Sequence, residues 1–168
     1  MKVSCAVLIC YINGETQMNN SFQCEVQNGT DLAANAKDAL ERVCSGKGLE
    51  SASRYYSHEF VDHVNNMEFP GLEGVRQSVE LYTKVLSDLE VAVEEQLTDG
   101  DRVASRFVVS GFSFGKRVRF NGITISRFKD GLIVEDWSVT DTLGMLRQLG
   151  AWRSILLGLR QWKDLKKS

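Results

Sequence analysis

Four segments in the second half of the chain alternate apolar and polar residues with a period of two. They cover residues 89–93, 101–111, 116–128 and 132–139. Such alternation is typical of β-strands that bury one face and expose the other. Asp99-Gly100 and Asp130-Gly131 fall between these segments, and Asp-Gly is a strong signal of a tight hairpin turn. The pattern therefore predicts a meander of antiparallel strands.

The first half of the chain has helical spacing instead. Residues 28–48 and 71–89 each carry an apolar stripe with the repeat of a helix; the stripes are Leu32, Ala36, Leu40 and Val43, then Val75, Val79, Tyr82 and Leu86. Between them, residues 49–56 predict a short helix and residues 57–64 an extended segment. Helices followed by a strand meander predict an α+β fold, with helices on one face of an antiparallel sheet.

A chain of 168 residues fits one domain, here placed at residues 30–150. Residues 1–29 form a leader of uncertain order. Its apolar run could be a short secretory signal at 1–17, but a strand or flexible leader, and a cytoplasmic protein, are favoured. Residues 151–168 have the spacing of an amphipathic helix whose polar side is largely basic. The helical pattern of the preceding residues is interrupted near Gly150. Packing of this helix on its own domain or on a second subunit is favoured over contact with a membrane.

Charge and motif spacing exclude several classes of function. A net charge of -2 argues against a nucleic-acid partner, which would call for a basic surface. The four cysteines contain no C-x-x-C pair, and the only two histidines, His58 and His63, are too few for a metal site. A G-x-S-x-G pattern at residues 111–115 lies between two predicted strands. It therefore predicts a turn rather than the strand-to-helix elbow of a serine hydrolase.

Acid/base chemistry in a pocket remains open. In the last strand Asp136 and Ser138 share one face, while Trp137 lies on the other. If the first face lined an apolar cavity, burial would raise the pKa of Asp136 and allow it to transfer protons. The pattern alone favours the other interpretation, in which Asp136 lies on a solvated face. Trp137 is either a surface for a ligand or, as favoured, a core or interface aromatic.

Several segments resemble the SnoaL-like polyketide cyclases in order and spacing, over about residues 32–150. The most specific are FVDH at 60–63, the F-x-DG-x-I-V-E-x-W pair at 128–137, and LRQLG at 146–150. This resemblance implies a nuclear-transport-factor-2-like fold, a cone-shaped sheet around a deep pocket that often dimerises through its outer face. It also implies ring closure by aldol condensation, with an aspartate as acid/base and no cofactor or metal.

The resemblance transfers only in part to individual residues. The family's catalytic aspartate falls on Ser138, its pocket histidine on Thr124, and an asparagine near Asp62. A substitute site is therefore predicted, with Asp136 as the first catalytic group. Either Asp62 or His63 would be the second, because strand alternation directs only one of them inward.

Ser138 and Thr124 are expected to bind substrate by hydrogen bonds. Arg106 would contact an oxyanion or carboxylate, or else face solvent. The predicted function is a cofactor-independent cyclase or isomerase acting on a small apolar polyketide-like or terpenoid-like substrate. A homodimer through the outer face of the sheet is expected from the resemblance. The alternative is a non-catalytic ligand-binding or dimerising module of the same fold.

Overall fold

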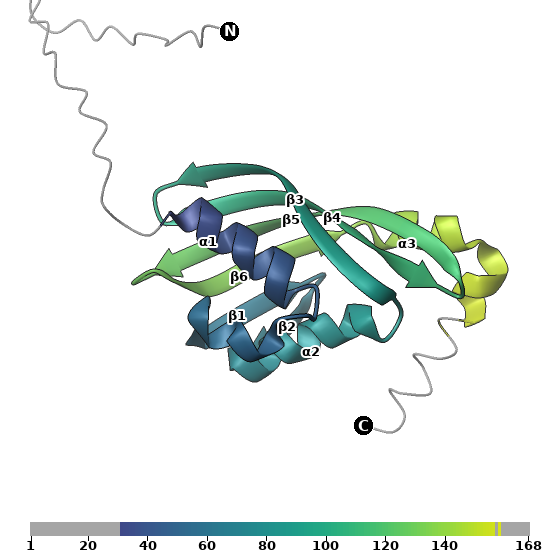
Figure 1. Cartoon of the computed structure of the whole chain (residues 1–168), viewed down its shortest axis with the longest axis horizontal. Helices are drawn as coiled ribbons and strands as arrows, with labels where there is room; N and C mark the ends of the chain where they lie inside the picture. Colours follow the sequence, from purple (N-terminus) through teal and green to yellow (C-terminus); the bar gives the residue numbers. More distant parts are fainter. Residues whose placement is uncertain (1–30, 157, 159–168) are drawn as a thin grey trace, which may run out of the picture.

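The computed structural model describes residues 31–156 and 158 of the chain, as an α+β domain (Figure 1). Its helical elements are α1 (Leu32–Asp38), a π-helix η1 (Ala39–Val43), a 3₁₀-helix η2 (Leu49–Arg54), α2 (Gly71–Thr83) and α3 (Thr142–Leu149). Its strands are β1 (Tyr56–Val64), β2 (Met67–Pro70), β3 (Ser87–Asp99), β4 (Arg102–Ser113), β5 (Lys116–Lys129) and β6 (Leu132–Thr140). The predicted helices and strands are thus confirmed in type and order.

The six strands form one curved, unclosed sheet in the order β2-β1-β6-β5-β4-β3. Strands β3 to β6 make the predicted antiparallel meander. The expectation of a wholly antiparallel sheet is wrong at one place, because β1 pairs with β6 in parallel. The meander returns its last strand alongside β1 in the same direction. This pairing joins segments more than 70 residues apart and places Asp62 opposite Asp136.

The hairpin turns follow the predicted chemistry. Gly100, Asp130 and Gly131 all have positive φ, the conformation that two-residue hairpin turns require. The serine pattern at 111–115 is also a hairpin turn, between β4 and β5, with positive φ at Phe114 and Gly115. A further turn at Asn65 and Asn66, which the sequence analysis did not predict, adds the short edge strand β2.

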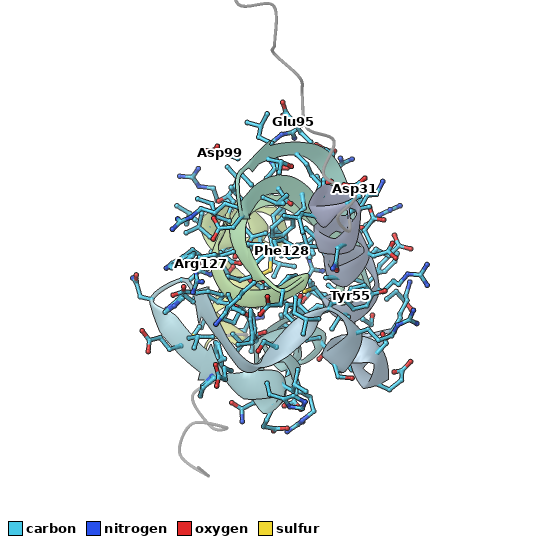
Figure 2. The ribbon with its side chains drawn as sticks, turned by 90° about the vertical axis from the view of Figure 1, so that its left-hand side faces the viewer. Asp31, Tyr55, Glu95, Asp99, Arg127 and Phe128 are labelled. Carbon is cyan, nitrogen blue, oxygen red and sulfur yellow. The ribbon has the colours of Figure 1, made fainter. Side chains whose placement is uncertain are left out.

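The core lies between the inner face of the sheet and the helices. One cluster joins α1, η1 and α2 to β1, including Ala36, Val43, Phe60 and Val75. Figure 2 shows this arrangement along the length of the domain: Phe128 lies inside the curl of the sheet, and its neighbour Arg127 points away from it. The predicted apolar stripes are therefore buried, although α2 ends at Thr83 and the buried Leu86 lies beyond it.

The second core cluster is covered at the far end of the sheet by α3 (Figure 1). The Asp141 side chain caps this helix by accepting a hydrogen bond from the Gly144 amide at 2.7 Å. Gly150, with φ of 83°, breaks the helix as predicted, and residues 151–156 resume a helical course. Most of the predicted 151–168 helix and the whole leader 1–29 lie outside the described residues. None of the described helices is long and apolar enough to cross a membrane.

Candidate functional site

A small pocket lies between the helices and the inner face of the sheet. Its volume is about 50 Å³, and it is lined by Leu40, Cys44, Asp62, Val64, Ser78, Val79, Tyr82, Leu89, Val91, Phe107, Val109, Ser138 and Thr140. A space of this size holds a few water-sized groups. The pocket can therefore enclose the reacting end of a ligand rather than a large molecule.

The pocket has a polar wall and an apolar wall because different elements build them. Strands β1 and β6 and helix α2 supply a carboxyl group and four hydroxyl groups; these belong to Asp62, Ser78, Tyr82, Ser138 and Thr140. Strands β3 and β4 supply only apolar side chains. A pocket with few polar groups set against apolar walls is the usual form of a small-molecule site.

Two carboxyl groups lie on neighbouring strands at this site, and one of them belongs to the polar wall. Asp62 and Asp136 are register partners on the parallel strands β1 and β6, which places their backbones about 5 Å apart. Their exposed fractions are only 9% and 5%. Each has a buried Oδ1 atom without a hydrogen-bond partner. Asp136 thus lies on the predicted inner face, but Asp62 is the one whose side chain lines the pocket.

Burial and mutual repulsion keep this pair from ionising together. Burial, and to a lesser extent the charge of Asp62, raise the pKa of Asp136 to about 8, although a hydrogen bond from Ser126 favours its ionised form. Burial also raises the pKa of Asp62 to about 6, although Ser78 and His63 favour its ionised form. Near neutral pH the pair therefore holds one proton, mainly on Asp136, and one negative charge, mainly on Asp62.

Two neutral groups lie near the pair, Cys44 at the end of η1 and Tyr56 at the start of β1. The Sγ atom of Cys44 lies 3.6 Å from the hydroxyl of Tyr56. Burial raises the pKa of the Cys44 thiol to about 12 and raises the pKa of Tyr56 well above its usual range. A thiol that stays protonated is a poor nucleophile. Cys44 therefore contributes to the wall of the site and not to covalent chemistry.

The hydroxyl groups of the polar wall form two hydrogen-bonded sets. Ser138 donates to Thr124 at 2.8 Å, and Thr124 is fully buried. The structure therefore brings these two predicted residues together, with Ser138 on the pocket and Thr124 behind it. The Thr140 hydroxyl lies 3.2 Å from the Tyr82 hydroxyl and accepts a hydrogen bond from Asn65 at 3.1 Å.

The other three candidate residues, His63, Arg106 and Trp137, lie on the outer face of the sheet and do not line the pocket. His63 points away from Asp62; its Nε2 atom lies 3.1 Å from Glu135 and its ring stacks on Trp137. Arg106 is exposed and pairs with Glu94 and Glu95, so the solvent-facing alternative holds. The physical reason is strand alternation, which places neighbours of inward residues outward.

Sequence reasoning missed three helical residues of the pocket: Cys44, Ser78 and Tyr82. Helical periodicity assigns Tyr82 to the buried stripe but does not show that its hydroxyl meets Thr140. The π-helical turn η1 was also not predicted. It changes the spacing of the helix next to Leu40 and Cys44, and π-helical turns often occur at functional sites.

Comparison with known proteins shows the family to which the chain belongs. No curated protein sequence matches the chain significantly. IdmH, a proposed polyketide cyclase from Streptomyces antibioticus, is 22% identical, with a TM-score of 0.65 over 73% of this chain and 100% of its own. A proposed polyketide cyclase from Bacillus cereus ATCC 10987 is 29% identical, with a TM-score of 0.60 over 71% of this chain and 78% of its own.

A third structure, from Catenulispora acidiphila DSM 44928, has a ketosteroid isomerase-like fold and was determined with trimethylamine. It is 15% identical, with a TM-score of 0.59 over 71% of this chain and 92% of its own. These likenesses confirm the nuclear-transport-factor-2-like fold. The sequence profile of the SnoaL-like polyketide cyclases matches residues 34–149, most of the domain. The chain therefore belongs to the SnoaL-like polyketide cyclase family, which supports a function of the cyclase type.

Proposed function

We propose that the protein is a cofactor-independent cyclase or isomerase that moves protons on a small, largely apolar carbonyl compound. The observation that carries this proposal is the buried carboxyl pair, of which Asp62 lines an otherwise mostly apolar pocket. An ionised carboxylate in a dry site is a stronger base than one in water. A neutral partner beside it holds the second proton in reserve.

In the proposed reaction, Asp62 accepts a proton from the carbon next to the carbonyl group. The electron pair of the broken C–H bond then forms an enolate, and its oxygen is stabilised by a hydroxyl donor at Tyr82 or Thr140, which lie 3.2 Å apart. In ring closure the enolate carbon attacks a second carbonyl, whose π electrons move to its oxygen, and that oxygen takes the proton back from Asp62. In isomerisation the proton on Asp62 is instead returned to a carbon of the enolate. Asp136, which does not line the pocket, acts through Asp62 as a positioning residue.

This arrangement offers a replacement for the family's catalytic aspartate, which is a serine at position 138 in this chain. The family's aspartate is absent there, but the register places Asp136 two residues earlier on the same face of β6 and Asp62 directly across on β1. The carboxylate function would thus have moved to the neighbouring strand. If it has not, the alternative is a non-catalytic ligand-binding module, which the serine at 138 favours.

Exchange of deuterium into ketones tests the proposal without knowledge of the natural substrate. A panel of small cyclic and linear ketones would be incubated with the protein in D₂O, and loss of the proton signals next to the carbonyl followed by NMR. We expect exchange above the buffer rate for at least some members. Ketones that bind, as seen from shifts in the protein signals, but never exchange would support the non-catalytic alternative.

We further propose that the outer face of the sheet forms a homodimer. Two cross-strand pairs, Ile123 with Val139 and Ile125 with Trp137, make an exposed apolar patch on β5 and β6. Charges of both signs border it, including the pair Arg127 and Glu135, whose atoms lie 2.7 Å apart. Because the border carries both signs, one copy can face another without net repulsion.

A charge placed in this patch should dissociate the dimer. We expect Val139→Lys to shift the protein from dimer to monomer in sedimentation velocity, because the dimer would bury an unpaired charge. Leu143→Lys, at an exposed apolar residue on α3, is the matched control and should leave the dimer intact. A wild-type monomer at tens of micromolar, or equal dissociation by both variants, would contradict the assignment of this face.

A further inference from the structure

The charge of the pocket restricts what it can bind. Of the described residues that line it, none is a lysine, arginine or histidine, whereas Asp62 lines it and Asp136 adjoins Asp62. His63 favours ionisation of Asp62 from the opposite face of β1, but its ring nitrogens already face Glu68 and Glu135. The net charge of the pair is therefore not neutralised by a basic group inside the pocket.

The carboxyl pair also has unused hydrogen-bonding capacity. The Oδ1 atoms of Asp62 and Asp136 are buried and unpartnered, although both side chains are more than nine-tenths buried. A buried acceptor without a partner destabilises the folded protein unless a ligand or water satisfies it. An anionic ligand would add repulsion, and an apolar one would leave the oxygens unsatisfied.

We propose that this pocket binds a small ammonium group, held against Asp62 by charge and by an N–H donor. One cation balances the single negative charge that the pair carries near neutral pH. The aromatic rings of Tyr82 and Phe107 in the wall suit the methyl groups of an alkylammonium ion. The pocket volume of about 50 Å³ suits a group of only a few heavy atoms.

This inference deepens the proposed function and rests on the same site. It implies that the natural substrate carries a basic nitrogen close to the reacting carbon. The two proposals fail separately. Deuterium exchange into ketones without ammonium binding would overturn only the proposed ammonium site. Ammonium binding without deuterium exchange into any ketone would overturn only the catalytic proposal.

The test compares trimethylammonium with tert-butanol, a neutral molecule of similar size, and with acetate. Binding to the full-length protein would be measured by NMR chemical-shift titration at pH 7.5. We expect saturable binding of trimethylammonium, at least tenfold weaker binding of tert-butanol, and no binding of acetate at this site. Affinity for the cation should fall on acidification to pH 5, because protons compete with it for the carboxyl pair.

Asp62→Asn should weaken trimethylammonium binding at least tenfold. Glu59→Gln makes the same chemical change on an exposed residue of the same strand and should have no effect. Asp136→Asn is a second test, should the first variant not fold. Equal binding of the cation and tert-butanol, or undiminished cation binding in the folded Asp62→Asn variant, would overturn the proposal. So would equal loss in Glu59→Gln, which would indicate attraction by overall charge only.

Discussion

Replacement of Asp62 by asparagine is expected to lower proton exchange into a ketone substrate by about 10²–10⁴-fold, the usual contribution of a positioned general base. Asparagine has nearly the same shape and still accepts a hydrogen bond, but it cannot accept the proton. The loss should appear in kcat rather than in KM, because the apolar wall that binds the substrate is unchanged. The measurement is the initial rate of deuterium exchange as a function of ketone concentration.

The melting temperature of Asp62→Asn shows whether a loss of activity comes from unfolding. Asp62→Asn removes a buried charge, so the melting temperature should stay level or rise. The exposed carboxyl on the same strand, Glu59, provides the matched substitution, and Glu59→Gln should exchange at the wild-type rate. A folded Asp62→Asn variant that retains full activity would remove Asp62 from the mechanism.

The free energy of unfolding of the wild-type protein is expected to decrease between pH 5 and pH 8. The pKa of Asp136 is raised to about 8 in the folded state, above an ordinary value of 3.8. Between these values the folded state binds more protons than the unfolded state, so stability decreases as the pH rises. One such proton accounts for up to about 4 kcal/mol over three pH units. The raised pKa of Asp62, about 6, adds to the decrease in the lower part of the window.

Urea unfolding at each pH measures this dependence, and Asp136→Asn should remove most of its slope above pH 6. The variant should therefore be more stable than the wild type at pH 8, unlike most substitutions at buried residues. The lowered pKa of Glu135 acts in the opposite sense. The stability that Glu135 contributes is lost as the pH falls through its lowered pKa, which lies below the range of pH 5 to 8. Equal slopes in wild type and Asp136→Asn would show that the pair does not hold the extra proton.

Much of the fold could be predicted because its signals are local. Alternation along β4, β5 and β6, and the Asp-Gly turns between them, depend on residues within a few positions of one another. The same alternation predicted that Asp136 and Ser138 share a face and that only one of Asp62 and His63 points inward. It could not show which one, since that depends on which face of β1 meets the helices.

The functional assignments depended on long-range contacts and were less predictable. Arg106 is a polar residue on a strand, and such residues occur on both faces of a sheet. Alternation along β6 already separated Trp137 from Asp136, but only the structure shows that Arg106 points outward to Glu94. The hydroxyl of Tyr82 meets Thr140 across 58 residues, a contact for which the sequence has no local signal.

By itself, the sequence determined the α+β class, the order of the elements, the family and which residues of β6 share a face. Only the tertiary structure decided that β6 returns parallel to β1. That pairing is a contact between distant segments, set by packing of the whole sheet on α1, η1 and α2 rather than by residue preference. It brings Asp62 beside Asp136 in a buried position, and two neighbouring carboxyl groups there cannot both ionise near neutral pH. The acid/base character of the site therefore belongs to the pair.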